Sequence, residues 1–303
     1  MHKFKRNPIS IEDNLKSVGK GLHKDQRIFF MTEEDNLKAA FKQYDDHASK
    51  NPVTLESLHP LWEILPTDAD TESQQKEEKQ NRSFKLYGSN RPFVNEHWEA
   101  LKAENGGKVL MCPICGMTEC SEMDHYMPRS IFQEFSSHVN NLIPLCHTCN
   151  LDKHNDWTDK HANRYFFNAF YDKLPGNIIA CTISINLAFP KINVKISSAL
   201  DKNDYSDAIV LRTFKKLDLL KKFQICANGI LRNEIIRMCN DYKVQKATYN
   251  NDRQAFWNSR VASFQSYISS PDGFNFLEKK IFEAIINSAD MKDWVENSQE
   301  FIK

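Results

Sequence analysis

The chain has 303 residues, of which 41% are hydrophobic, and its 40 Lys and Arg balance its 40 Asp and Glu. This balance argues against a basic coat for nucleic acid, and the apolar content suffices for one large domain or two smaller ones. No apolar run of about 18 residues occurs, and the basic start leads into no apolar segment. The sequence therefore predicts neither a transmembrane helix nor a signal peptide.

The first 65 residues predict a helical region. Residues 31–50 place Leu37, Phe41 and Tyr44 on one face of a helix, which Thr32 is expected to cap at its N-terminus. The spacing of these apolar side chains is the helical one, so they are expected to pack into a core.

A polar stretch follows this helical region. Residues 66–82 contain no apolar side chain except that of Ala69. They predict a solvated linker, which we place at residues 66–90, with a long charged helix as the alternative.

The middle of the chain combines helical and extended patterns. A helix is expected over residues 91–107, where a Gly-Gly pair ends it, and residues 108–112 (KVLMC) predict a short strand. Farther on, residues 150–174 predict a helix followed by an aromatic packing segment.

The remainder, residues 176–303, predicts a β-hairpin and then helices. Isoleucines and Cys181 alternate with polar residues over residues 179–185, and Ile192, Val194 and Ile196 repeat this period of two. Residues 205–250 hold nine basic and four acidic side chains. We interpret them as the solvated side of amphipathic helices, and a nucleic-acid face is the alternative.

Two C-x-x-C pairs, Cys112/Cys115 and Cys146/Cys149, stand 30 residues apart. Four thiolates complete a tetrahedral Zn²⁺ site with no open position, so the predicted role of this zinc is structural. The alternative is a redox-active pair, which would need a thioredoxin-like βαβ pattern that the sequence lacks. Metal-binding cysteines fit a reducing compartment, so we expect a cytoplasmic protein.

The segment between the pairs carries candidate catalytic groups. Asp124 and the asparagines Asn141 and Asn150 offer hard oxygen atoms that suit Mg²⁺ or Mn²⁺, and the His125 imidazole suits deprotonation of water near neutral pH. Phosphodiester hydrolysis needs both functions. An isolated Asp-His pair is more often structural, and an Asn after a cysteine usually caps a helix. Their coincidence inside one cysteine frame favours catalysis.

These elements, in this order and spacing, resemble the HNH endonuclease family in its zinc-supported form, over residues 112–154. The resemblance implies an α+β fold: a ββα-metal core, in which a β-hairpin and a helix surround one divalent ion, embedded in a mainly helical protein. It places the nuclease domain at residues 91–175.

The same resemblance assigns roles within the motif. It implies His125 as the general base, Asp124 and Asn150 as ligands of Mg²⁺ or Mn²⁺, and Asn141 as the residue that braces the hairpin loop and orients His125. Asn150 departs from the histidine that is commoner at its position, which favours Mg²⁺ over a transition metal. Adjacent residues of a strand point to opposite faces, so a twist or bulge is expected if Asp124 and His125 reach one phosphate.

Three further residues are candidates for the site. His154 follows Asn150 by four residues, and it is a candidate ion ligand or phosphate contact if the intervening segment is helical. Arg129 and Lys153 are candidate phosphate-binding residues. For Arg129, a surface salt bridge is the alternative.

In its layout and its aromatic segment at residues 164–175 (RYFFNAFYDKLP), the chain also resembles the PtuB-type HNH component of Septu anti-phage defence. That resemblance implies a nucleic-acid substrate, with DNA favoured over RNA, and a partner ABC-type ATPase, in some systems with a retron. Two alternatives stay open: a non-catalytic zinc ribbon that binds nucleic acid or protein, and a toxin-like RNase.

Overall fold

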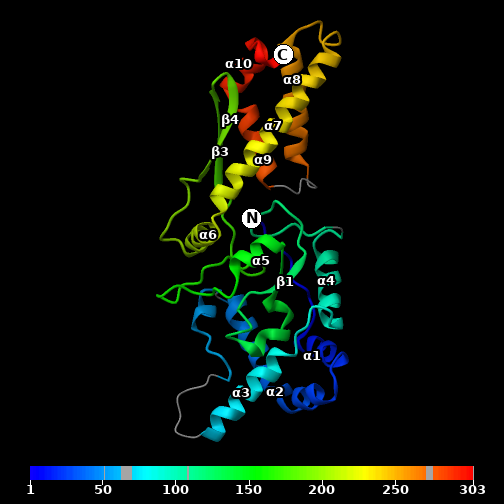
Figure 1. Cartoon of the computed structure of the whole chain (residues 1–303), viewed down its shortest axis with the longest axis vertical. Helices are drawn as coiled ribbons and strands as arrows, with labels where there is room; N and C mark the ends of the chain where they lie inside the picture. Colours follow the sequence, from blue (N-terminus) through cyan, green and yellow to red (C-terminus); the bar gives the residue numbers. More distant parts are fainter. Residues whose placement is uncertain (51, 63–69, 108, 271–275, 303) are drawn as a thin grey trace. The chain divides into compact units, whose positions relative to one another are not determined.

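The structure is a computed structural model that describes residues 1–50, 52–62, 70–107, 109–270 and 276–302 (Figure 1). The chain divides into two compact units, Met1–Leu174 and Pro175–Lys303. Helices dominate the described part of both units, and each unit holds a two-stranded antiparallel sheet. The predicted α+β class is confirmed. None of the described helices is long and apolar enough to cross a membrane.

The first unit begins with the helices α1 Ile11–Lys20, α2 Lys24–Lys50, α3 Asp70–Phe84 and α4 Pro92–Glu104. Of these, α1, α2 and α4 bury apolar side chains in its core. Leu37, Phe41 and Tyr44 of α2 are fully buried, as their spacing predicts. Thr32 is not an N-cap, because α2 begins at Lys24 and the Thr32 hydroxyl donates to the carbonyl of Ile28 within the helix (2.9 Å).

The predicted solvated linker is wrong over much of its length, because residues 70–84 form helix α3. Residues 63–69 lie outside the described residues. Two ion pairs at helical spacing, Glu72–Lys76 and Glu78–Arg82, support this polar helix. At its end, the buried Ser83 hydroxyl donates to the carbonyl of Gln133 (2.9 Å). Tertiary contacts therefore order a segment that has no apolar stripe of its own.

A small ββα motif follows α4. Strand β1 (Glu122–His125) pairs antiparallel with β2 (Leu142–Leu145), and helix α5 (His147–Lys153) comes directly after β2. The connection from β1 to β2 contains the short 3-10 helices η2 (Gln133–Ser137) and η3 (Val139–Asn141).

The strand expected at residues 108–112 does not form. Residue 108 lies outside the described residues, and the rest contributes an isolated bridge from Met111 to Glu119. The backbone of Cys112 is used in a tight turn instead: its N–H donates to Thr118, and its carbonyl accepts from Gly116 (2.8 and 2.7 Å).

The segment after α5 is irregular but densely packed. Phe166, Phe167 and Phe170 are buried, as expected of an aromatic packing segment, whereas the helix before them is short and ends at Lys153. The fully buried Arg164 forms an ion pair with Asp172 (3.0 Å), and this pair joins the residues on either side of the three phenylalanines.

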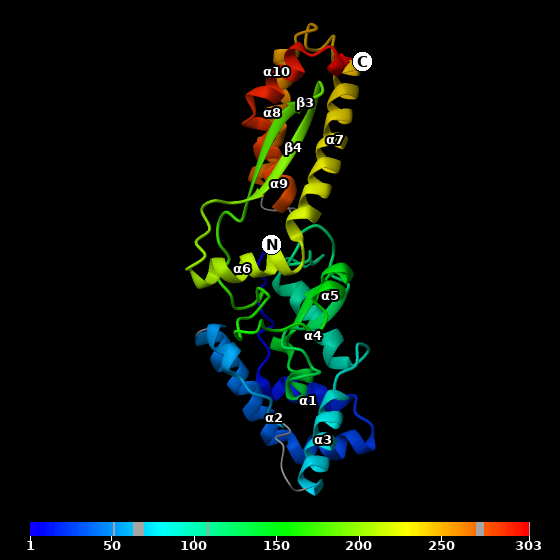
Figure 2. The ribbon, with the colours of Figure 1, turned by 60° about the vertical axis from the view of Figure 1, so that its left-hand side comes forward.

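In the second unit, the predicted hairpin is confirmed as β3 (Ile179–Asn186) and β4 (Phe189–Ile196). Figure 2 shows α7 running alongside this hairpin. The helices are α6 Tyr205–Lys216, α7 Leu219–Gln245, α8 Arg253–Ser269, α9 Phe276–Ile286 and α10 Ala289–Asn297. Asp218, at φ +48°, interrupts the helical pattern between α6 and α7.

Candidate active site and cysteine cluster

The ββα motif carries a cluster of four buried cysteines. The sulfur atoms of Cys112, Cys115, Cys146 and Cys149 all lie within 4.8 Å of one another. Cys112 and Cys115 belong to the turn before β1, whereas Cys146 is the N-cap residue of α5 and Cys149 lies in its first turns. The four predicted zinc ligands are thus brought together, and their all-sulfur donor set is that of a structural Zn²⁺ site.

His125, the last residue of β1, is only 8% exposed. Its Nε2 lies 2.9 Å from the carbonyl oxygen of Ser136, and its ring meets Tyr87 edge to face at 4.4 Å. Because a carbonyl can only accept, the proton of the neutral ring belongs on Nε2 and the lone pair on Nδ1. This tautomer presents Nδ1 as a base.

The environment of His125 keeps its ring neutral. Burial is the largest cause that lowers the pKa of His125 to about 3; the positive charges of Arg129 and Lys153 act in the same direction, whereas the hydrogen bond to Ser136 opposes the shift. A histidine in this state holds no proton of its own at Nδ1 near neutral pH. Its Nδ1 lone pair is therefore free, although the low pKa makes the ring a weak base while burial and the two cations act on it.

Asn141 ties together the loop that holds His125. It is fully buried, its Oδ1 accepts from the N–H of Met127 (2.8 Å), and its Nδ2 donates to the carbonyls of Met127 and Phe135 (3.1 and 3.2 Å). Phe135 directly precedes Ser136, the acceptor of the His125 hydrogen bond. These contacts are what the bracing role predicted for Asn141 requires.

Asp124 lies in an ion pair with Lys153. The carboxylate is 8% exposed, and its Oδ2 is 2.9 Å from the Lys153 ammonium, which also donates to the His125 carbonyl (2.9 Å). Burial raises the pKa of Asp124, although Lys153 partly offsets the shift. Lys153 is itself 3% exposed, so the structure places this predicted phosphate-binding residue against Asp124.

Asn150 of α5 contacts a residue that sequence reasoning missed, Glu122. The Asn150 Nδ2 donates to one carboxylate oxygen of Glu122, and the other oxygen lies 2.6 Å from His147 Nδ1. This bond orients the amide so that Oδ1 is left as its coordinating atom. Glu122 precedes Asp124 by two residues on β1, and this period of two is the signal that could have identified it.

The comparisons with known proteins bear on this motif. Residues 112–156 match the family model for HNH endonuclease. This segment is an HNH endonuclease domain. The match spans both cysteine pairs, both strands and α5. Comparison with curated proteins and with solved structures gave no match.

Within the HNH domain, the strand pairing is regular through Asp124 and His125, which face Ile143 and Leu142 of β2. The bulge expected between them is therefore absent from β1. His125 contacts the η2 carbonyl of Ser136, and Asp124 contacts Lys153 of α5.

The HNH domain has an open face beside α5. Glu122 and Asn150 line a cleft of about 350 Å³ together with Tyr87 and Trp98. His125 and Asp124 are not among the lining residues of this cleft, but Tyr87 of its wall contacts the His125 ring.

His154 and Arg129 occupy the margins of the HNH domain. The segment from Asn150 to Lys153 is helical, and His154 is the exposed residue that ends α5, at φ +51°, so its role as an ion ligand or phosphate contact stays a prediction. Arg129 is half-buried, with its guanidinium 4.1 Å from the ring centre of Phe84 and 5.1 Å from that of Tyr87. Among the described residues it forms no ion pair, contrary to the salt-bridge alternative.

The donor chemistry of the HNH domain fits a hard divalent cation. The Asp124 carboxylate is buried, its pKa is raised by that burial, and additional positive charge beside it would stabilise its ionised form. The Asn150 Oδ1 is a second oxygen donor. In the described part of the chain, only the cysteine cluster brings together three or more Cys, His, Asp and Glu side chains closely enough to hold an ion, so no such group of three surrounds Asp124.

Proposed function

We propose that the HNH domain makes this chain a metal-dependent endonuclease that hydrolyses phosphodiester bonds of nucleic acid, with DNA favoured over RNA. The observation that carries the proposal is the state of His125: a buried, neutral imidazole whose Nε2 is committed to Ser136 and whose Nδ1 is the base. A zinc-ribbon binding module would need no such group.

In the proposed mechanism, His125 Nδ1 takes a proton from water, and the resulting hydroxide attacks the phosphorus. The bond to the 3′-oxygen breaks, and that oxygen leaves with the electron pair. Asn141 and Ser136 keep the imidazole in position throughout.

Asp124 and Asn150 are the residues that would hold Mg²⁺ or Mn²⁺, and Glu122 would keep the Asn150 amide oriented. When bound there, the ion supplies positive charge for the phosphate and the leaving oxygen. Arg129, which lies beside Tyr87, would add a second positive charge. The four cysteines would hold Zn²⁺ in a closed shell, so the zinc takes no part in hydrolysis.

We further propose that the nuclease works with a partner that delivers its substrate. Residues 111–165 hold seven acidic and four basic side chains, so this segment by itself attracts DNA only weakly. An ABC-type ATPase, with or without a retron, is the partner that the resemblance to anti-phage defence components implies, in a cytoplasmic complex. A toxin-like RNase is the alternative, because the catalytic groups do not distinguish DNA from RNA.

The test is the His125→Ala variant. It should lose at least about 100-fold in the cleavage rate of plasmid DNA with Mg²⁺ or Mn²⁺, because general-base catalysis contributes roughly that much. Zinc content and melting temperature report whether the fold is kept, and His125→Gln serves as a variant of similar volume. Cleavage at the unaltered rate in both variants would refute the mechanism.

A further inference from the structure

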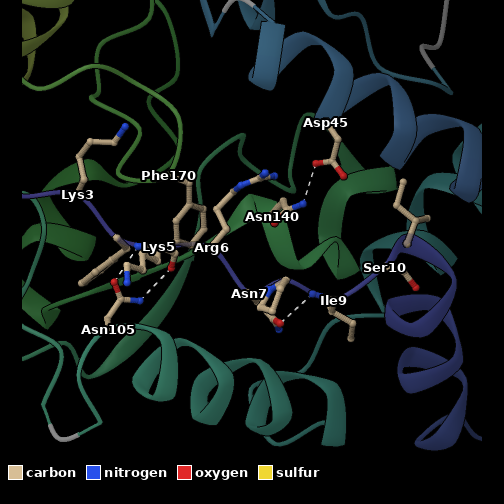
Figure 3. Close-up of a pocket in the computed structure, with 13 residues that line it drawn as sticks. Lys3, Lys5, Arg6, Asn7, Ile9, Ser10, Asp45, Asn105, Asn140 and Phe170 are labelled. Atoms are coloured by element: carbon tan, nitrogen blue, oxygen red, sulfur yellow. Dashed lines mark hydrogen bonds between the residues drawn. The ribbon is translucent and has the colours of Figure 1, made fainter.

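The first unit contains a second, larger cleft of about 850 Å³, formed along its N-terminal segment (Figure 3). Three cationic side chains from that segment line it, Lys3, Lys5 and Arg6, and all three are exposed. None of the catalytic candidates lies in its wall. The proposed mechanism therefore leaves this cleft without a role.

The backbone that carries these cations is fixed on both sides. The N–H groups of His2 and Phe4 donate to the carbonyls of Pro113 and Ala169 (3.0 Å each). The Asn105 side chain accepts from the N–H of Lys5 (2.7 Å) and donates to its carbonyl (2.9 Å), as Figure 3 shows. The three positive charges therefore belong to an ordered stretch of backbone, so little backbone entropy is lost when a ligand binds to them.

The cleft has an excess of positive charge. Among the described residues, Lys3, Lys5 and Arg6 form no ion pair with a carboxylate, although Arg6 donates to the Tyr171 hydroxyl (2.8 Å) and stacks on its ring. In α1, by contrast, Lys16 and Lys20 are paired with Asp13 and Glu96.

The single carboxylate of the cleft wall, Asp45, is already engaged. Its Oδ1 is 3.0 Å from His138 Nε2 and accepts from Asn140 (2.8 Å) and Tyr171 (3.1 Å). Burial alone would raise the pKa of Asp45, but the charge and hydrogen bond of His138, with those other bonds, hold the pKa below its usual value. Three cations thus face one carboxylate, whose Oδ1 is in contact with three groups of the protein.

This cleft adjoins the loop that holds His125. Asn140 lines the cleft, and the next residue, Asn141, holds the loop of His125. Both belong to η3. A ligand in the cleft would therefore lie against the segment that positions the proposed base.

We propose that this cleft binds the sugar-phosphate backbone of the nucleic-acid substrate, an inference that rests on the proposed nuclease function. Lys3 and Arg6 are separated by up to about 10 Å of extended chain. Cations spread over that length match the repeated charges of a polynucleotide better than one small anion.

The experiment compares two double variants in the full chain with divalent ions withheld, so that binding is measured without cleavage. Lys3→Gln/Lys5→Gln removes two cations of the cleft, and Lys16→Gln/Lys20→Gln removes two paired cations of α1. Fluorescence anisotropy of labelled DNA and RNA, single- and double-stranded, gives Kd at several salt concentrations. Thermal melting establishes that each variant is folded.

The cleft variant should lower the slope of log Kd against log salt by about 1.4 for single strands or about 1.8 for duplexes, which at about 0.1 M salt weakens Kd roughly 25-fold or roughly 60-fold, respectively. The α1 variant should change Kd less than twofold. Equal weakening by both variants, no weakening by either, or no binding by the unaltered protein would each overturn the proposal.

The two proposals can fail separately. Salt-dependent binding that is lost in the cleft variant, without cleavage when Mg²⁺ or Mn²⁺ is supplied, would refute the nuclease and support the binding cleft. Normal cleavage and binding by the cleft variant would refute the cleft and leave the nuclease in place.

Discussion

Neighbouring residues of β1 meet two different environments. His125 donates a hydrogen bond from Nε2 to the Ser136 carbonyl and is kept neutral by burial, whereas Asp124 forms an ion pair with the Lys153 ammonium. A neutral base and an anionic oxygen donor thus stand side by side in the chain. What each side chain contacts, rather than its place in the motif, sets its chemistry.

The ion pair of Asp124 leads to a prediction for Lys153→Met. Removing the ammonium leaves the buried carboxylate without its partner, which should lower the free energy of unfolding by about 3–5 kcal/mol without divalent ions. If Mg²⁺ binds at Asp124, added Mg²⁺ should raise the melting temperature of this variant more than that of the unaltered protein.

The matched control is Lys42→Met, which removes an exposed ion pair with Asp46 and should cost less than about 1 kcal/mol. Thermal and urea unfolding, each with and without Mg²⁺, measure these effects. A Lys153→Met protein as stable as the control would show that the pair contributes little.

Among the elements, the ββα motif is made of pieces too short to be stable alone. Its strands have four residues each and α5 has seven, well below the length at which isolated elements persist in water. The cysteine cluster joins the turn before β1 to the start of α5. A metal ion there would hold the motif's two ends together.

We therefore expect Cys115→Ser to lower bound zinc and to destabilise the domain, since a structural zinc site contributes directly to folding. The control is Cys120→Ser, which alters a cysteine of the same segment outside the cluster. Zinc content per chain and melting temperature are the measurements. One zinc per chain in Cys115→Ser would contradict the assignment of all four cysteines as ligands.

Element by element, the sequence predicted best where apolar side chains are periodic. The β3–β4 hairpin and α4 follow directly from such patterns, and the cysteine spacing identified the cluster. Helix α3 was predicted only as the alternative to a linker, because ion pairs and the contacts of its last turn, rather than an apolar stripe, order it. Glu122 was missed because its partner Asn150 is 28 residues away and meets it only once β1 and α5 are packed.

For the molecule as a whole, stability should depend on pH through Glu134 of η2. This side chain is 1% exposed; its Oε1 accepts from the N–H of Leu61 (2.9 Å), and its Oε2 has no partner among the described residues. Burial raises the pKa of Glu134 to about 7 from its ordinary value of 4.5. The folded protein thus binds this proton more tightly than the unfolded chain.

This stabilisation is complete below about pH 4.5 and is lost as the pH rises through about 7. The shift of 7 − 4.5 = 2.5 corresponds to at most about 3 kcal/mol. Glu134→Gln, which keeps an oxygen for Leu61, should therefore be more stable than the unaltered protein at pH 8 and gain nothing at pH 4.5. Urea unfolding at both values tests this, and an equal gain at both would exclude ionisation of Glu134 as the cause.

The short helix η3 gives one side chain to the large cleft and the next to the catalytic loop. If binding at one of these sites changes η3, the two sites are coupled thermodynamically, and such coupling is reciprocal. If nucleic acid in the cleft restricts η3, then a substrate analogue held at His125 tightens binding in the cleft by the same factor. Adjacent asparagines would in this way link the recognition of a long substrate to the positioning of the proposed base.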